Sequence, residues 1–259
     1  MGKSVARWAL AGVLLLTACT APTPQAAPPD PTEQALLDDF RRAVYGPAGT
    51  GNRHLAKWTG PIRAAVIGPD RSDYRAAARR HLADLADLTG LAVDEAPEAQ
   101  ANLLLFYADD PFAAARDHRA RFAHRIPDPA AFGKRQDVMA PGATCFGFVW
   151  GGWPGGRGID FAVVFIRTDR GERTVGGCLV QQTTQVLGLL YDLDSSAESV
   201  FGDAGAYIDL TARDRLLLQM LYDPSLRPGM GWTEAEPLAR ATFRALLQRT
   251  AAVGGSLTR

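Results

Sequence analysis

The chain has 259 residues, of which 47% are hydrophobic and 22% charged, and this composition is typical of a globular protein with a sizeable core. Its 28 Lys and Arg residues balance 28 Asp and Glu residues, so no net field attracts nucleic acid and we expect no nucleic-acid partner. Beyond the signal-like N-terminus, no stretch of the sequence is apolar enough to span a bilayer.

The N-terminus has the pattern of a bacterial lipoprotein signal. Lys3 and Arg7 precede a short apolar run that ends in the tetrad Leu16-Thr17-Ala18-Cys19, which has the form of a lipobox. We therefore predict that residues 1–18 are a signal peptide and that Cys19 is lipidated as the first residue of the mature chain. Acyl chains such as palmitate would hold the domain at a membrane. The alternative is an ordinary cleaved signal in which Cys19 is incidental.

The segment after the signal is a predicted tether. Residues 19–31 combine Cys19 with a run rich in Pro and Ala, which offers nothing to bury and stays extended. A protein lipidated in this way is expected in the bacterial cell envelope, anchored to a membrane through the lipid and facing the periplasm. Thr20, rather than Asp, at the second mature position favours the outer membrane over the inner one.

Hydrophobic spacing then predicts alternating helices and strands. A capping pattern followed by apolar residues at helical spacing indicates a helix over 32–44. A second helix, over 70–88, carries an apolar stripe and ends at Gly90, a residue type that closes many helices. The strands expected in this part are 55–67, 91–93 and 101–108. The last of these is apolar throughout, as a strand covered on both faces would be.

The middle of the chain contains a short helix within 112–122 and two further strands, over 144–150 and 159–167. Their connection, 151–158, is rich in glycine but lacks the Lys-Ser/Thr of a phosphate-binding loop and precedes a strand, so a hairpin is the better interpretation. The order of elements predicts one α/β (α+β) domain over residues 32–253, with a tail at 254–259.

Two cysteines remain beyond Cys19. In an oxidising envelope compartment the pair Cys145 and Cys178 suggests one disulfide. The alternative is a nucleophilic Cys145 with His124 as its base, although nothing nearby resembles a cysteine-protease signature.

The most informative stretch is a predicted helix between Gly177 and Gly188. It can be compared with the zinc-protease pattern H-E-x-x-H-x-x-G-x-x-H. Gln181 stands at the first His of that pattern, Gln182 at the Glu and Gln185 at the second His. Three glutamines on an ordinary polar helix face are the alternative.

The comparison extends downstream of the glutamines. Gly188 falls on the turning glycine of the pattern and Tyr191 on its third ligand, with Asp192 one residue later. A capping box at 211–214 opens the next helix. Met230 then follows an Arg-Pro-Gly turn, where a metzincin-like chain places its Met-turn, although a lone Met after a turn is more often core filler.

These motifs resemble a bacterial family of lipoproteins known as domain of unknown function 2927. The resemblance spans roughly residues 53–247 and is most specific between Cys178 and Met230, including Gln185-Val-Leu-Gly-Leu189 and Leu221-Tyr-Asp-Pro224. It implies a zincin-like fold, in which a twisted mixed sheet packs against helices, with a degenerate active-site helix and a Met-turn-like segment. Members of the family often carry acidic residues where this chain has Gln181 and Gln182.

The residue types on this helix argue against a working zinc site. Catalytic zinc takes three protein ligands of the His, Cys or carboxylate type, whereas a Gln amide is neutral and cannot accept a proton from bound water. The four histidines lie upstream of the helix: His54, His81, His118 and His124. We therefore expect no metal, no other cofactor and no catalytic residue. The vestigial metal-site positions are Gln181, Gln182, Gln185, Asp192 and Met230.

Three functions stay open at this point. The leading one is a lipid-anchored, non-catalytic domain whose cleft and edge strand, expected at 159–167, bind a peptide or envelope protein by strand addition. The second is a hydrolase with a non-standard site at Asp192 or Asp194. The third is a structural envelope lipoprotein.

Overall fold

The computed structural model describes most of the chain from the first predicted helix onward. The described residues are 31–47, 51–69, 71–128, 144–151, 158–194, 198–202 and 207–252. The predicted signal peptide, Cys19, nearly all of the tether and the tail at 254–259 lie outside them. Within the described ranges, no helix is both long and apolar enough to cross a membrane.

Helices and strands alternate in the first two thirds of the chain, and helices follow. The strands are β1 (Ile62–Ile67), β2 (Val93–Glu95), β3 (Leu103–Ala108), β4 (Cys145–Gly151) and β5 (Ile159–Arg167). The α-helices are α1 (Pro31–Tyr45), α2 (Ser72–Thr89), α3 (Pro111–Asp117), α4 (Arg119–Phe122), α6 (Glu172–Gln185), α7 (Ala212–Leu221) and α8 (Trp232–Ala252). Two short 3-10 helices cover Glu98–Gln100 and Ala123–Arg125. The predicted mixture of helices and strands is confirmed.

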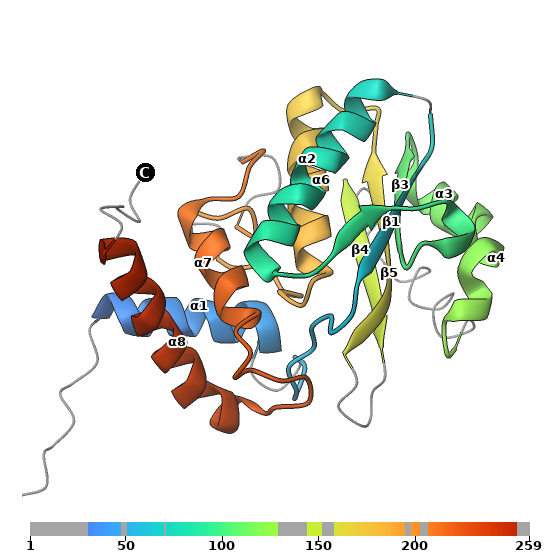
Figure 1. Ribbon diagram of the computed structural model, residues 1–259. Coiled ribbons are helices and arrows are strands. Elements are labelled where there is room, and N and C mark those ends of the chain that lie inside the picture. The colour runs from blue at the N-terminus through green and yellow to red at the C-terminus, as the bar shows by residue number, and fades with distance from the viewer. Residues whose placement is uncertain are drawn as a thin grey trace, which may run out of the picture.

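The five strands form one mixed sheet in the order β2-β1-β3-β5-β4 (Figure 1). Four strands run parallel, and β4 pairs antiparallel with β5, as the predicted hairpin requires. The expectation that 159–167 forms the edge of the sheet is wrong, because β3 pairs with the other side of β5. The interior place of β5 fits its sequence, since residues 161–166 are all apolar and all buried. Strand β4 is the edge next to it.

Helices cover both faces of the sheet (Figure 1). Helices α2 and α6 lie on one face, in a core that continues into α1, α7 and α8. Helices α3 and α4 lie on the other face, over an aromatic layer that includes the buried rings of Phe106, Phe122 and Phe165. Parallel strands need crossover connections, and the crossover helices supply the apolar cover that a sheet buried on both faces requires.

The predicted helix ends are confirmed where their chemistry is local. Gly90 follows α2 with a φ of 71° and donates its backbone N–H to the Ala86 carbonyl. Helix α7 begins with the predicted capping box, in which Thr211 and Asp214 each accept a hydrogen bond from the backbone N–H of the other.

A disulfide joins Cys145 on β4 to Cys178 on α6, with the two Cα atoms 5.7 Å apart. The predicted pairing is confirmed. The bond also removes Cys145 as a free nucleophile, so the alternative that pairs it with His124 is wrong. Its structural effect is to tie the edge strand to the helix that carries the glutamines.

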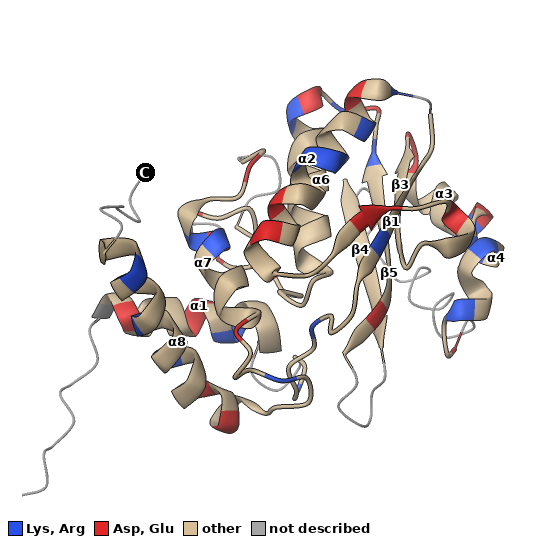
Figure 2. Cartoon of the chain, in the orientation of Figure 1, with Lys and Arg blue, Asp and Glu red and all other residues tan. Residues whose placement is uncertain are grey.

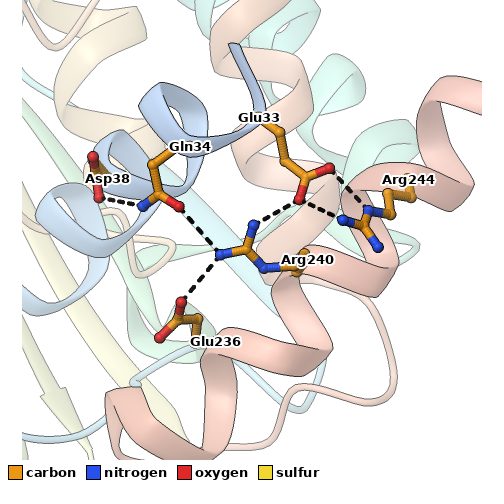
Figure 3. Close-up of polar contacts among 6 residues, drawn as sticks. All are labelled: Glu33, Gln34, Asp38, Glu236, Arg240 and Arg244. Atoms are coloured by element: carbon orange, nitrogen blue, oxygen red, sulfur yellow. Dashed lines mark hydrogen bonds and ion pairs between the residues drawn. The ribbon is translucent and has the colours of Figure 1, made fainter. Parts of the chain in front are cut away.

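Helices α1 and α8 are joined by a nearly buried carboxylate. Glu33 accepts hydrogen bonds from Arg240 at 2.7 Å and from Arg244 at 2.9 and 3.0 Å (Figure 3). The side chain of Glu33 is 8% exposed, and its hydrogen bonds to Arg244 hold its pKa below the usual value. Arg240 extends the network to Gln34 and Glu236 (Figure 3). The network fixes α1, whose other end contacts the site described below.

Several elements differ from the predictions. The strand expected at 91–93 is β2, which covers Val93–Glu95, and the helix expected between Gly177 and Gly188 is α6, which begins at Glu172 and ends at Gln185. The stretch 55–67 forms a strand only from Ile62, and the helix expected within 112–122 divides into α3 and α4 at His118. Helix α8 was not predicted. Apart from Pro237, it consists mostly of helix-forming residues such as Ala, Leu, Arg and Glu, and the Glu33 network joins it to α1.

Candidate functional site

Helix α6 places the three glutamines near its C-terminal end. Gln181 is 5% exposed and Gln182 is 8% exposed, while Gln185 is half-buried. The amide nitrogens of Gln181 and Gln185 both donate to Oδ1 of Asp192, at 3.2 and 2.7 Å. A carboxylate can only accept, so chemistry requires both amides to present their nitrogens. The structure thus brings three of the predicted site positions together.

A sharp turn after α6 returns Asp192 to the helix. Gly188 has a φ of 124°, and a Cβ at this position would lie in hard contact with the Ala56 carbonyl oxygen, so only glycine fits. The backbone N–H of Tyr191 then donates to the Ala43 carbonyl at 3.0 Å. Arg42 donates to the Asp192 carbonyl, also at 3.0 Å. Helix α1 therefore holds the returning segment, and the turn predicted at Gly188 is confirmed.

The two carbonyl groups that directly follow α6 accept hydrogen bonds from two aromatic side chains. Trp58 Nε1 donates to the Val186 carbonyl at 2.9 Å, and the Tyr222 hydroxyl donates to the Leu187 carbonyl at 2.9 Å. Beside them, Lys57 Nζ donates to the Leu221 carbonyl at 2.9 Å, and burial lowers the pKa of Lys57 to about 8. These contacts satisfy carbonyls that helix ends leave free, so they stabilise the site rather than line it.

A cleft of about 500 Å³ lies between the end of α6 and strand β4. Gln182 and Gln185 line it from the helix side, and residues 147–150 line it from the strand side. Its other lining residues include Asn52, Asp128, Val186, Leu190 and Tyr191. Gln181 is not part of the lining, and its Oε1 atom is buried without a hydrogen-bond partner in the described part of the chain. Two of the three predicted glutamines therefore face a shared concavity.

Gly147 sets the distance between strand β4 and the glutamine helix. A Cβ at this position would lie 2.9 Å from Val186 Cγ1 and 3.4 Å from Gln182 Oε1. A larger residue would push strand and helix apart, whereas the disulfide holds them together two residues away. Gly147 was not predicted as a site residue. The signal was present, because a glycine inside an apolar strand often marks the close approach of another element.

The outer side of β4 presents backbone hydrogen-bonding groups. The Arg167 N–H donates to the Thr144 carbonyl, and the register pairs Cys145 with Ile166. Hydrogen-bonded pairs alternate along an antiparallel ladder. The N–H and C=O groups of Gly147 and Val149 therefore point away from β5. No strand in the described sheet pairs with that side of β4.

Strand β4 has an uncharged edge, and its register with β5 is interrupted at its end, between Trp150 and Gly151. Its sequence, Cys-Phe-Gly-Phe-Val-Trp-Gly, contains no charged residue, and it carries neither blue nor red in Figure 2. Exposed sheet edges are commonly guarded by charged residues or proline against pairing with other chains. An uncharged edge beside a cleft is therefore suited to accept another strand.

Met230 lies in the core rather than against the glutamines. It is 4% exposed, and its carbonyl accepts hydrogen bonds from the Leu55 N–H at 2.8 Å and the Tyr45 hydroxyl at 3.2 Å. The Arg227 N–H lies 3.3 Å from its sulfur, within a turn where Gly229 has a φ of 93°. None of the contacts found in the described ranges joins Met230 to the three glutamines.

The histidines are dispersed among structural contacts. His81 Nε2 lies 3.2 Å from Thr184 Oγ1, between α2 and α6. His54 Nδ1 lies 2.9 Å from the Gly229 carbonyl oxygen, and His118 stacks on the Phe106 ring. Across the described residues, no group of three or more His, Cys, Asp or Glu side chains is arranged to hold a metal ion.

The fold and the cleft together define a mixed α/β protein with an amide-lined cleft beside an uncharged sheet edge. The chain belongs to the family described as "Protein of unknown function (DUF2927)", which matches residues 33–241. The family expected from the sequence is therefore confirmed.

Comparisons with named proteins and with solved structures give less information than the family match. An alignment over 96 residues, which covers 34% of this chain, shows 32% identity to an Arabidopsis thaliana protein named Endoglucanase 13. The match covers 19% of that protein, so the chain corresponds to a minor part of its length. No solved structure matches the chain.

Proposed function

We propose that this protein is a non-catalytic binding domain of the bacterial cell envelope that captures an extended peptide segment as an additional strand on β4. The observation that carries the proposal is the outer edge of β4. Gly147 and Val149 point backbone N–H and C=O groups away from β5, beside a cleft and on a strand without charge. In strand addition, such groups give affinity through main-chain hydrogen bonds, and neighbouring pockets give specificity.

The scaffold we propose is zincin-like. Four features support it: the antiparallel edge strand beside the glutamine helix, the turn at Gly188, the return of Asp192 to that helix, and the positions of the glutamines. In this interpretation Gln181 and Gln185 occupy the places of two metal ligands, and Gln182 occupies that of the base. Amides in these places support binding without metal-dependent hydrolysis.

The cellular part of the proposal is attachment through lipidated Cys19, with the domain facing the periplasm from the outer membrane. The lipobox supports attachment. The Cys145–Cys178 disulfide supports an oxidising compartment, because such bonds persist in the periplasm and are rare in the cytosol. The Pro- and Ala-rich tether would give the domain reach from the membrane to an envelope partner.

Val149→Pro tests the proposal, because it removes an outward N–H without removing a ladder bond to β5. Proline is tolerated on an edge strand when its nitrogen faces outward. With the full chain in detergent and fluorescent heptapeptides of alternating Thr and Val, wild type should show saturable binding. Val149→Pro should weaken that binding by about tenfold, the effect of roughly one lost main-chain hydrogen bond.

Val149→Ala is the matched control, because it shortens the same side chain but keeps the N–H. It should bind the heptapeptides nearly as wild type does. The proposal fails if none of the peptides shows saturable binding, or if Val149→Pro and Val149→Ala bind equally well.

The alternative is a hydrolase with a non-standard site at Asp192 or Asp194. The two carboxylates are close in sequence, and the partial relative bears the name of an endoglucanase. The contacts favour a binding role over hydrolysis, however, because both carboxylates already have partners. Asp192 accepts two amide hydrogen bonds, and Asp194 forms an ion pair with Arg42 at 3.4 Å. Cleavage of β-glucan or peptide substrates that Asp192→Ala abolishes would establish the hydrolase instead.

A further inference from the structure

Gln182 differs from the other two glutamines because its amide is unpaired. Gln181 and Gln185 both donate to Asp192. In the described part of the chain, no hydrogen bond involves the side chain of Gln182, although the residue is only 8% exposed and lines the cleft. Unlike Oε1 of Gln181, the polar atoms of Gln182 are not fully buried, so the amide is open to hydrogen bonding by a ligand in the cleft. This side chain therefore points to a polar group on whatever occupies the cleft.

The position of Gln182 relative to Gly147 identifies the part of a bound strand that it would meet. The side chains of Cys145 and Val149 lie on the α6 face of β4, and a Cβ at Gly147 would point to the same face, 3.4 Å from Gln182 Oε1. On an added strand, the residue paired with Gly147 presents its side chain to this face too, about 5 Å away. Because Gly147 has no side chain of its own, that residue has open access to Gln182.

The chemistry of Gln182 selects the kind of side chain. An amide offers one acceptor oxygen and two donor hydrogens, so its full complement is a second carboxamide, which both donates and accepts. An ammonium group would leave the Gln182 nitrogen unpaired. A carboxylate would leave its oxygen unpaired and would also approach the Asp128 carboxylate in the cleft.

We propose that the cleft recognises an Asn or Gln side chain on the captured strand, at the residue paired with Gly147, and that Gln182 is the specificity-determining residue. This inference rests on the proposed strand addition to β4 and names its ligand class.

The experiment measures the binding of heptapeptides of alternating Thr and Val to the full chain in detergent. In each peptide one residue is replaced by Asn, Gln, Ala, Asp or Lys. The replacement is made at the fourth residue in one series and at the fifth in the other, so that each face of the strand is sampled. Wild type should bind the Asn or Gln peptide about tenfold more tightly than the Ala peptide. Gln182→Met, which keeps the length of the side chain and removes both polar atoms, should abolish this preference, so that the Asn, Gln and Ala peptides bind it alike.

Gln182→Glu provides the second measurement, because it keeps the shape and replaces the donor nitrogen by a charged oxygen. It should lose the preference for carboxamide and gain a preference for Lys. Amide recognition is overturned if the five residue types bind wild type alike at both positions while Val149→Pro still weakens binding, and strand addition then stands. If no peptide binds, or if Val149→Pro binds as Val149→Ala does, the proposed function itself is wrong and amide recognition with it.

Discussion

Asp214 and Asp192 each accept hydrogen bonds from several neighbouring side chains or backbone groups, but they differ in burial and in how many of their oxygens are used. Asp214 is fully buried and uses both carboxylate oxygens. It accepts from the Ser199 hydroxyl at 2.5 Å, the Val200 N–H at 3.1 Å, and the backbone and hydroxyl of Thr211, each at 2.8 Å. Asp192 is exposed and receives the amides of Gln181 and Gln185 on one oxygen only.

The difference shows what each cluster contributes. A carboxylate without access to water is stable only when hydrogen bonds replace its hydration, so the Asp214 cluster is saturated and holds the 198–202 segment against α7. The Asp192 cluster remains in contact with solvent, and water can replace any partner it loses. It positions side chains at a cleft and leaves Gln182 unpaired. We therefore expect changes at the first cluster to act on stability and changes at the second to act on binding.

The largest expected effect on stability comes from Asp214→Ala. The substitution leaves the donors from Ser199, Val200 and Thr211 unpaired in a buried site, and we expect the free energy of unfolding to fall by about 3 to 4 kcal/mol. Denaturant unfolding of the two proteins measures the difference. Thr211→Val, which removes one of the donors, should cost only about 1 kcal/mol. A loss below about 1 kcal/mol for Asp214→Ala would contradict the structural role given to this cluster.

The second prediction converts the exposed cluster into a metal site. With Gln181→His and Gln185→His, two imidazoles one helical turn apart would face Asp192, which already lies within hydrogen-bonding distance of both side chains. We expect this double variant to bind Zn²⁺ with a Kd of about 1 μM or below, at least about a hundredfold tighter than wild type. Calorimetry with Zn²⁺ alone measures the affinity.

Removing the third ligand provides the control for the metal site. Asp192→Ala in the double variant should weaken Zn²⁺ binding by about tenfold or more, since two ligands hold the ion poorly. If the double variant binds Zn²⁺ no better than wild type, the three positions do not share a ligand geometry, and the zincin-like interpretation of the helix loses its main support.

The third prediction concerns His81, which is buried like Asp214 but neutral. Burial lowers its pKa to about 4, while Asp84 raises the pKa and Arg215 lowers it. The pKa is about 6.5 in an unfolded chain, so protonation favours unfolding. The stabilisation is therefore complete above pH 6.5 and is lost as the pH falls towards 4, by about 2 to 3 kcal/mol.

Comparison of wild type with His81→Gln isolates this effect from the titration of carboxylates. Denaturant unfolding at pH values between about 7 and 4 should show a shallower loss of stability for His81→Gln. The exposed His124→Gln should follow wild type. Equal slopes for wild type and His81→Gln would contradict the prediction, because they would mean that the pKa of His81 is the same in the folded and the unfolded chain.

The sequence predicted those features whose cause is local. Strand β5 was predicted with the bounds that the structure shows, and Gly90 and the Thr211–Asp214 capping box act as their residue types indicate. Gln181, Gln185 and Asp192 were singled out by comparison with a zinc-protease pattern, and the structure brings them together through the turn at Gly188 and the contacts of α1 with the returning segment.

The features that the sequence did not predict depend on distant partners. Whether β4 or β5 forms the edge is decided by the pairing of β5 with β3, and neither strand encodes that pairing by itself. Gly147 and Val149 become site residues only because α6 packs against their face of β4. The place of α8 against α1, although not its helix-forming composition, depends on contacts of Arg240 and Arg244 with Glu33, more than two hundred residues away in sequence.

The smallest expected effect on stability is that of Asp192→Ala, the counterpart of Asp214→Ala. Because Asp192 is exposed, its removal leaves the Gln185 amide free to bind water, and the cost should fall mainly on the buried Gln181 amide. We expect the free energy of unfolding to fall by about 1 kcal/mol or less. Parallel denaturant unfolding of the two alanine variants gives the comparison directly. Adding Gln181→Leu to Asp192→Ala should recover part of the loss, since the orphaned amide is then absent. A loss above about 2 kcal/mol for Asp192→Ala would show instead that this carboxylate maintains the turn after α6, and the two clusters would then share one structural role.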